Sequence, residues 1–393
     1  MPSFDIPKRL HASQHAAGGS DPITPASIGA YTKTEVDTVV GIPATKFGVS
    51  SSGTAAANGA ALQAALLEAR NQKVPLVLPG FTFQSSATLE VDDGDWIVGQ
   101  GMRNHTLVFH TGSGPFITGL AAPDLTLENF KVQGLPSAGA HGIHLQMGTS
   151  DATSSPHAYM RNVYIRAFGG DGFHLPSGWL GRLDHCYAEG NLGKGFYIAG
   201  RPSQSVGGTS TTLTSCYANN NGTIGYHIDR MNYSALVACA ADSNPIGYHL
   251  QNALGITLLS CGAEGSEDRA FVIQDSSQIG LLQCQDLGSA VGSIDVFGIS
   301  RGVDIAGYFE MSPPSGKTFS LRVTSGTRGH LRSNMFTTSM GMASNNAYWR
   351  RDNLLAEPPD ISSLGASGTS TIAQIETTVN KIVASMRAEG KIW

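Results

Sequence analysis

The segment IGYHI at residues 224–228 is repeated as IGYHL at residues 246–250. Four further segments have the same form: GIHL (142–145), GFHL (172–175), GFYI (195–198) and AFVI (270–273). The pattern alternates with period two, which is typical of a β-strand, and it has no helical stripe of apolar residues. A repeat at intervals of about 20–50 residues indicates a solenoid of stacked units.

The cysteines mark a second position in the same repeat. They follow one another at 22 to 30 residues: Cys186, Cys216, Cys239, Cys261 and Cys284. Aligned units read LDHCYAEG (183–190), LTSCYANN (213–220) and LLSCGAEG (258–265), and Val163 and Phe130 take the cysteine position in two earlier units. An odd count without CxxC argues against a zinc site. We therefore predict an inward ladder of inert packing thiols.

These observations predict an all-β fold, a parallel β-helix. Each unit supplies two or three short strands, and like residues stack about 4.8 Å apart on successive turns. Leucine-rich repeats have a similar period, but their LxxLxLxxN pattern is absent.

Strand alternation assigns the histidines to one column. If Tyr226 and Ile228 point inward, the residue between them points outward. The predicted outward column consists of His144, His174, Tyr197, His227 and His249. One interpretation is a trimer interface or a solvated face that tolerates histidine. The other is a carbohydrate-binding strip, to which Trp179 of an inserted loop would add a ring.

A column of charged and polar residues lies three positions after the cysteine ladder. Its members are Arg166, Glu189, Asn219, Asp242 and Glu264. Asp242 and Glu264 would be one turn apart, at about 5 Å, near the carboxylate separation of retaining glycosidases. Glu189 and Asp242 would be two turns apart, at about 10 Å, near the upper limit for inverting glycosidases. Glu189, Asp242 and Glu264 are thus the candidate catalytic residues. The alternative is ordinary solvated groups at the turns of a solenoid.

Composition excludes several functions. The net charge is −5, only 14% of residues are charged, and no basic run is present, so neither nucleic acid nor an anionic membrane is an expected partner. No apolar run approaches the roughly 20 residues of a membrane span, and the N-terminus lacks the apolar centre of a signal peptide. P-loop, GxSxG, HExxH and EF-hand motifs are absent. No cofactor and no metal is predicted.

Residues 46–101 have a different pattern. Asn58 is a predicted N-cap, and Leu62, Ala65, Leu66 and Ala69 form the apolar stripe of a helix. A helix here would plug the open end of the solenoid, whose edge would otherwise invite aggregation.

FGVSSSG, AALQAALLEA, VPLVLPGFTF and VGQG in this segment resemble the opening of the pectate-lyase-like right-handed β-helices of phage tailspikes. The resemblance covers roughly residues 46–300, with Ala-Ala-Asn in place of the usual acidic run before the helix. It implies the fold, whereas the polygalacturonase-like set of NTD, paired Asp, GHG and RxK is missing. HASQHAAGGSDPITPASIGAYTKTEVD (11–37) resembles the head of phage tail fibres, which implies virion attachment through tail or baseplate proteins. His11 and His15 have a metal-like helical spacing but no evident third ligand.

The C-terminal stretch predicts a helix with a heptad pattern. Its apolar positions are Ile372, Ile375, Val379, Ile382 and Met386. Isoleucine at both core positions favours a three-stranded coiled coil, with a packed amphipathic helix as the alternative. The predicted domains are a tether at 1–45, the β-helix at 46–310, a short-strand region at 311–365 and this helix at 366–393.

The resemblance and the repeat together predict a homotrimeric phage tail spike or fibre, made in the host cytoplasm and carried on the virion tail. Its expected function is recognition of a host-surface polysaccharide. A depolymerase, either a glycosidase or a lyase with a base from the histidine column, is the alternative. A purely structural baseplate component and a secreted pectate lyase are two further alternatives.

Overall fold

The computed structural model describes residues 41–102, 106–120, 124–146, 158–176, 178–200, 208–310, 317–324, 327–332, 340–342 and 348–351. The chain divides into two units, Met1–Arg350 and Arg351–Trp393. Apart from Arg351, the second unit lies outside the described residues, and so do residues 1–40. No helix within the described ranges is long and apolar enough to cross a membrane.

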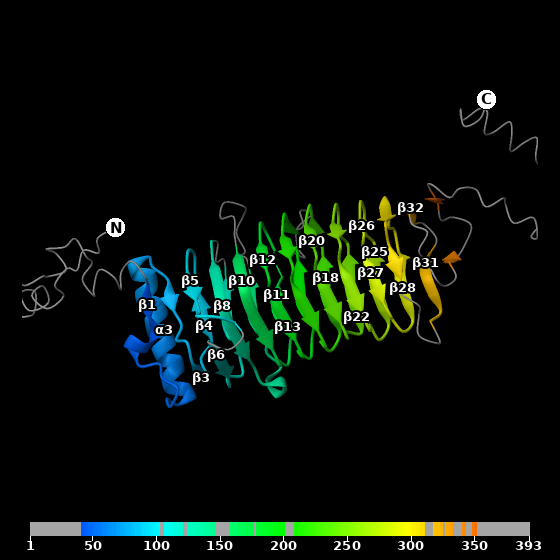
Figure 1. Ribbon diagram of the computed structural model, residues 1–393. Coiled ribbons are helices and arrows are strands. Elements are labelled where there is room, and N and C mark those ends of the chain that lie inside the picture. The colour runs from blue at the N-terminus through cyan, green and yellow to red at the C-terminus, as the bar shows by residue number, and fades with distance from the viewer. Residues whose placement is uncertain are drawn as a thin grey trace, which may run out of the picture. The chain divides into compact units, whose positions relative to one another are not determined.

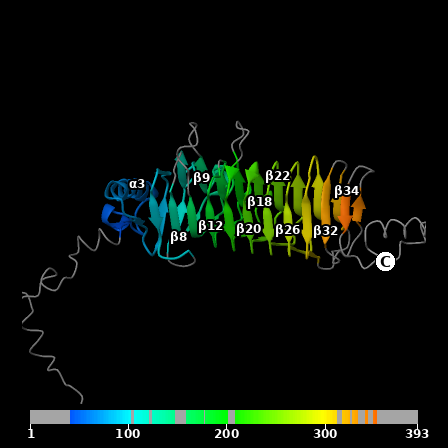
Figure 2. The same cartoon turned by 90° about the horizontal axis from the view of Figure 1, so that it is seen from above.

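The described part of the first unit is a parallel β-solenoid, which confirms the predicted all-β β-helix (Figure 1). Every pairing between its strands is parallel, and each turn adds one strand to each of three columns, here called faces 1, 2 and 3. Figure 2 shows the same stack from above.

Face 1 begins with β1 (Ile42–Pro43), β2 (Leu76–Val77) and β5 (Trp96–Val98). It continues through β12 (Arg182–Asp184), β16 (Thr212–Thr214), β20 (Ala235–Val237), β23 (Thr257–Leu259), β26 (Gly280–Leu282), β29 (Val303–Ala306) and β32 (Arg328–Arg332). Face 2 contains β3 (Thr82–Ser85), β6 (Leu107–His110), β13 (Tyr187–Glu189), β17 (Tyr217–Asn219), β21 (Ala240–Asp242), β24 (Gly262–Glu264), β27 (Gln285–Leu287) and β30 (Phe309–Glu310). Two longer strands run through both faces: β8 (Thr126–Gln133) and β10 (Tyr159–Arg166).

Face 3 is an 11-stranded sheet. Its strands are β4 (Leu89–Val91), β7 (Ile117–Leu120), β9 (Ile143–Gln146), β11 (Phe173–Leu175), β14 (Phe196–Ala199), β18 (Ile224–Asp229), β22 (Ile246–Gln251), β25 (Arg269–Gln274), β28 (Gly292–Phe297), β31 (Phe319–Val323) and β33 (Met340–Met342). β34 (Tyr348–Arg351) is a further strand of the sheet that contains faces 1 and 2, whereas η3 (Pro136–Ala138), β15 (Gly208–Thr209) and β19 (Met231–Asn232) lie outside the three faces.

A single residue in the left-handed backbone conformation forms the bend between faces 1 and 2. In seven successive turns the residue just before the ladder position has a φ between 50° and 61°: Asn129, Asn162, His185, Ser215, Ala238, Ser260 and Gln283. None of these is glycine, although this region is unfavourable for other residues. Because each bend lies directly before the ladder position, it fixes the start of the next strand.

The predicted ladder is confirmed. All five cysteines are at most 1% exposed, and Phe130 and Val163 are fully buried in line with them. Each thiol donates a weak hydrogen bond to a main-chain carbonyl, as Cys216 does to Leu183 O at 3.3 Å. On face 3 the inward side chains stack as rings 4.7–5.0 Å apart: Phe173, Phe196, Tyr226, Tyr248 and Phe271. Tyr226 and Ile228 therefore point inward, as the alternation predicted.

Buried amides line the turn between faces 2 and 3. Asn191, Asn221 and Asn244 are each at most 2% exposed. Asn191 Nδ2 donates to Asn221 Oδ1 at 2.9 Å, and Asn221 Nδ2 donates to Asn244 Oδ1 at 3.0 Å. Asn221 Nδ2 also donates to Ala188 O at 3.1 Å. The amides thus satisfy one another along the axis of the stack, as buried polar groups must.

Helix α3 (Ala55–Gln72) lies at the N-terminal end of the stack, next to η2 (Ala44–Phe47) (Figure 1). The predicted stripe of Leu62, Ala65, Leu66 and Ala69 is buried, so the helix covers this end as expected.

The predicted N-cap is wrong: Thr54 caps the helix, and its hydroxyl accepts from Ala57 N at 3.2 Å. Asn58 lies one turn inside the helix, fully buried. Its side chain accepts from Ser50 N at 3.0 Å and donates to Gln84 O at 2.9 Å. The alanines at 55–57 are strong helix formers, so the helix starts before Asn58. The Asn58 side chain instead joins the helix to the loop at Ser50 and to strand β3 at Gln84 by hydrogen bonds.

Candidate functional site

Three tyrosines form an outward row on face 2. Tyr164 on β10, Tyr187 on β13 and Tyr217 on β17 pair in register, and both centroid distances along the row are 5.6 Å. Each follows a buried ladder residue directly, so strand alternation turns its ring outward. The rings are half-buried. Their even spacing gives a strip of apolar faces with a hydroxyl on each ring.

The row lines a hollow of about 350 Å³, here called the tyrosine groove. Met102, Lys131, Glu189 and Asn219 complete its lining. The Lys131 ammonium lies 4.3 Å from the centre of the Tyr164 ring, a cation–π contact. Burial, and then the neighbouring Arg166, lower the pKa of Lys131, whereas Glu189 raises it. The groove therefore offers apolar ring faces between a cation, a carboxylate and an amide.

The charged column lies two residues beyond the tyrosines on the same face. Pairing aligns Arg166 with Glu189, Glu189 with Asn219, Asn219 with Asp242, and Asp242 with Glu264. Asp242 and Glu264 thus occupy neighbouring strands, about 4.8 Å apart along the stack, while Glu189 is two strands from Asp242. Glu264 is exposed, and the other two are half-buried.

The groove and the acidic column meet at Tyr217. Its hydroxyl donates to Asp242 Oδ2 at 2.5 Å. Burial, followed by this hydrogen bond to the carboxylate, raises the pKa of the Tyr217 phenol. The phenol therefore keeps its proton at neutral pH and holds the Asp242 carboxylate at the end of the groove.

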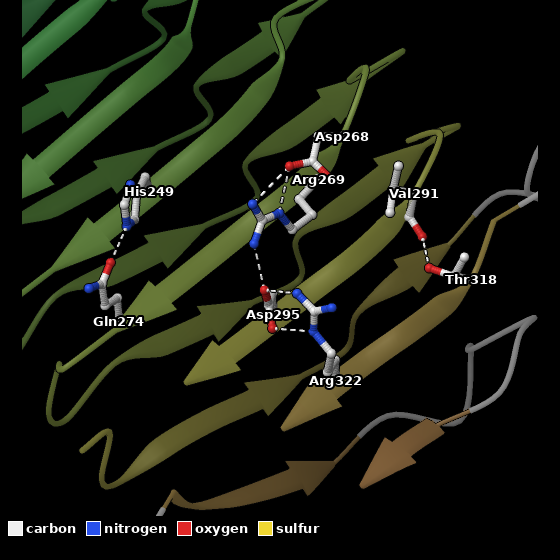
Figure 3. Close-up of polar contacts among 8 residues, drawn as sticks. All are labelled: His249, Asp268, Arg269, Gln274, Val291, Asp295, Thr318 and Arg322. Carbon is white, nitrogen blue, oxygen red and sulfur yellow. Dashed lines mark hydrogen bonds and ion pairs between the residues drawn. The ribbon is translucent and has the colours of Figure 1, made fainter. Parts of the chain in front are cut away.

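The histidine column is continuous on the outer side of face 3. Pairing joins His144 to His174, His174 to Tyr197, Tyr197 to His227, and His227 to His249. His227 and His249 stack at 4.8 Å, and each places Nε2 3.2 Å from a glutamine oxygen on the next strand; Figure 3 shows this contact for His249. Burial, then the charge of His249, lower the pKa of His227 to about 3. These rings are therefore neutral at pH 7 and closely packed, with His227 only 9% exposed.

Beyond His249 the same column becomes ionic. Its next members in register are Val272, Asp295 and Arg322. The Asp295 side chain is 1% exposed and accepts from Arg269 at 2.6 Å and from Arg322 at 2.9 Å and 2.5 Å (Figure 3). Both guanidinium groups are thus held on one buried carboxylate, which is a structural ion cluster.

The other predicted residues lie elsewhere. Trp179 is half-buried at a corner, where it bridges to Thr209, and is not a member of the histidine column. The heptad residues Ile372, Ile375, Val379, Ile382 and Met386 lie outside the described residues, as do His11 and His15. Among the described residues, one group could hold a metal ion. It consists of His141, Asp171 and His174, whose ligand atoms lie within 4.8 Å of one another.

The tyrosine groove was missed by reasoning from the sequence. The signal was present in the aligned units, where VYIR, CYAE and CYAN each place tyrosine directly after the ladder residue. No such pattern pointed to Lys131, because its cation–π contact is made with the ring of Tyr164, one turn away.

No family model and no curated protein matches this chain. Among solved structures, full-length tailspike protein 2 of Escherichia coli O157:H7 bacteriophage CAB120 has a TM-score of 0.65 at 14% identity over 84% of this chain and 48% of its own. The enzymatically active domain of bacteriophage CBA120 tailspike protein 2 has a TM-score of 0.63 at 14% identity, over 84% and 53%. The gp42 tailspike of Acinetobacter phage vb_AbaP_AS12 has a TM-score of 0.54 at 10% identity, over 79% and 61%.

At these identities the likeness concerns the fold: the chain has the parallel β-helix found in phage tailspikes. It spans between 48% and 61% of the length of the three tailspike structures.

Proposed function

We propose that this protein is a phage tail component that recognises a host-surface polysaccharide, and that the tyrosine groove is its glycan-binding site. The observation that carries the proposal is the row of three outward rings 5.6 Å apart. Tyrosine presents a rigid apolar face to the C–H face of a sugar and a hydroxyl for its hydroxyl groups. A periodic row suits a periodic polymer, and the tailspike fold supports the biological setting.

The polar groups of the groove support the same ligand class. Lys131 supplies a cation, Glu189 an acceptor, and Asn219 both a donor and an acceptor. A mostly apolar concave surface with a few convergent polar groups is the usual form of a small-ligand site. The cation at one end favours a glycan that carries an acidic group.

Cleavage of the bound glycan is a second candidate function. It is favoured by the register that places Asp242 and Glu264 on neighbouring strands next to the groove. Their spacing of about 4.8 Å falls near the roughly 5 Å of retaining glycosidases, whereas Glu189 and Asp242 are about 10 Å apart, beyond the inverting range. One solved structure of similar fold, from tailspike protein 2 of bacteriophage CBA120, is described as an enzymatically active domain.

Assembly is also a proposal. We propose that the heptad residues of 366–393 join three chains and that residues 1–45 attach to tail or baseplate proteins of the virion. Three copies would multiply the avidity of a short groove without any new contact within it.

The test is binding of the purified full chain to an array of bacterial capsular and cell-wall polysaccharides. For each polymer bound, we expect Tyr187→Ala and Tyr217→Ala to weaken binding about tenfold or more, equivalent to roughly 1.4 kcal/mol, as for a central aromatic contact. The matched control is Tyr233→Ala, because Tyr233 is 69% exposed and lies outside the groove. Equal affinities for all three variants and the original protein would refute the groove.

Cleavage is measured separately, by sizing the soluble sugar released from a bound polymer. Glu264→Gln should abolish release while binding persists, if the neighbouring carboxylates act on the glycan. Intact polymer with the unmodified protein would exclude the second function and leave recognition in place. Shortened products with Glu264→Gln would assign cleavage to another site.

A further inference from the structure

His141, Asp171 and His174 gather at the outer surface of face 3. His141 lies just before β9; Asp171 lies two residues before β11, one turn further along, and His174 lies within β11. The two histidine rings stack at 3.9 Å, and His144 adds a third imidazole, 4.8 Å from His174 and 5.3 Å from His141. Three imidazoles and one carboxylate therefore share a single surface site.

The distances in this cluster suit a tetrahedral ion. Asp171 Oδ2 lies 2.7 Å from His174 Nδ1 and 3.8 Å from His141 Nδ1. Ligands at about 2.0–2.1 Å from a tetrahedral zinc ion are roughly 3.3 Å from one another. The two observed values lie on either side of this separation, each within about 0.6 Å of it, and the ligand atoms of all three residues lie within 4.8 Å of one another.

The carboxylate is held in place from behind. The Asp171 side chain is 7% exposed, and its Oδ1 accepts from Lys194 N at 2.6 Å, which leaves Oδ2 directed at the histidines. A Cβ at Gly193 would come within 2.3 Å of Oδ1. Outer hydrogen bonds of this kind orient the carboxylate ligands of metal sites.

The histidines are reachable and oriented. Their side chains are 29% and 18% exposed, so an ion can enter from solvent. Asp171 N donates to His141 Nδ1 at 2.9 Å, which fixes that ring; an ion bound at Nδ1 would replace this hydrogen bond. A Cβ at Gly170 would lie 2.7 Å from the same atom.

We infer that His141, Asp171 and His174 bind one divalent transition-metal ion, and that Zn²⁺ is the ion that fits best. Imidazole nitrogen with one carboxylate oxygen suits zinc, copper and nickel, whereas calcium and magnesium require oxygen ligands. The ion would join two successive turns of the solenoid. Bound only by the folded state, it would stabilise the protein by mass action.

The inference is tested by titrating zinc chloride into chelator-treated full chain that carries His11→Ala and His15→Ala, which removes the other histidine pair at metal-like spacing. We expect one zinc ion per chain and a higher melting temperature, with no such response to calcium or magnesium chloride. His141→Ala and His174→Ala should each weaken binding by about tenfold or more. His249→Ala is the matched control, because it removes a stacked imidazole from the same column without touching the site.

Either of two results with the parent chain and the histidine variants would overturn the inference. One is the absence of saturable zinc binding by the parent chain. The other is binding that His141→Ala, His174→Ala and His249→Ala leave equally strong. Asp171→Asn guards against misfolding, since the amide keeps the shape of the carboxylate and loses only its charge. Folded Asp171→Asn protein with weakened zinc binding supports the site, and the same protein with unchanged binding contradicts it.

Discussion

The ammonium group of Lys317 is buried in the C-terminal turns of the solenoid. Its side chain is 0% exposed and contacts Asp286 Oδ2 at 2.6 Å, Glu310 Oε1 at 2.5 Å and Ser293 Oγ at 2.6 Å. Both carboxylate side chains are also 0% exposed. The cation thus links face 2 to face 3 and faces two carboxylates at once.

Replacing Lys317 with methionine keeps the aliphatic stem and removes the charge. The two carboxylates then remain buried side by side. Ser293 Oγ contacts both, at 2.5 Å and 2.9 Å, but has only one proton to donate. Removing one partner of a buried ion pair costs about 3–5 kcal/mol, and we expect Lys317→Met to fall in this range. Lys317→Met/Glu310→Gln should recover part of the loss, because one buried charge is then removed.

The assay is amide hydrogen exchange, because a solenoid opens locally and a single unfolding free energy would average its turns. A loss of 3–5 kcal/mol corresponds to exchange faster by roughly two to four orders of magnitude at β28 and β31. The matched control is Arg182→Met: this guanidinium is 66% exposed, so its pair with half-buried Asp184 at 2.8 Å should be worth about 1 kcal/mol at β12, well below the Lys317 cluster. If the two variants changed local exchange equally, the buried cluster would carry no special stabilisation and the reasoning would be refuted.

Two further predictions concern the polar ladders. The pKa of His227 is about 3 when folded and roughly 6.5 when unfolded, so its contribution is complete above pH 6.5 and is lost as the pH falls toward 3. Lowering the pH from 6.5 to 4 should therefore reduce the free energy of unfolding of the original protein by up to about 3 kcal/mol more than that of His227→Gln. Asn221→Leu should cost about 2–4 kcal/mol in local opening free energy, measured by amide exchange at β17, because Asn191 Nδ2 loses its acceptor and Ala188 O loses the donor Asn221 Nδ2. Half-buried Thr214→Leu should stay within about 0.5 kcal/mol.

The inward half of this structure was predictable from the sequence. A buried column admits only small or apolar side chains, so the cysteines at one position and the Phe or Tyr of GFYI and GYHI at another recur with the period of the turn. Strand alternation then determined the face of each neighbour, and the predicted histidine column appears in register. Burial constrains these positions so strongly that a single sequence was sufficient.

The outward half was less predictable, for a physical reason. An outward side chain is not restricted by the core, so its chemistry depends on neighbours one turn away, which lie 22 to 33 residues distant in the sequence. The Lys131–Tyr164 contact and the His141–Asp171 contact both arise in this way. Asn58 was misassigned for a related reason, because its partner Gln84 lies in another element.

The proposed glycan-binding row on face 2 is short. Along face 2, the outward position after the ladder is occupied in register by Lys131, the three groove tyrosines, Ala240 and Gly262. The row of rings therefore ends after two steps of 5.6 Å, with a cation at one end and no ring at the other. Regular backbone stacking continues for many turns, but the chemistry suited to a sugar does not. A site this short holds a few sugar units, so tight attachment would depend on several copies acting together, which is the physical reason to expect assembly of the chain.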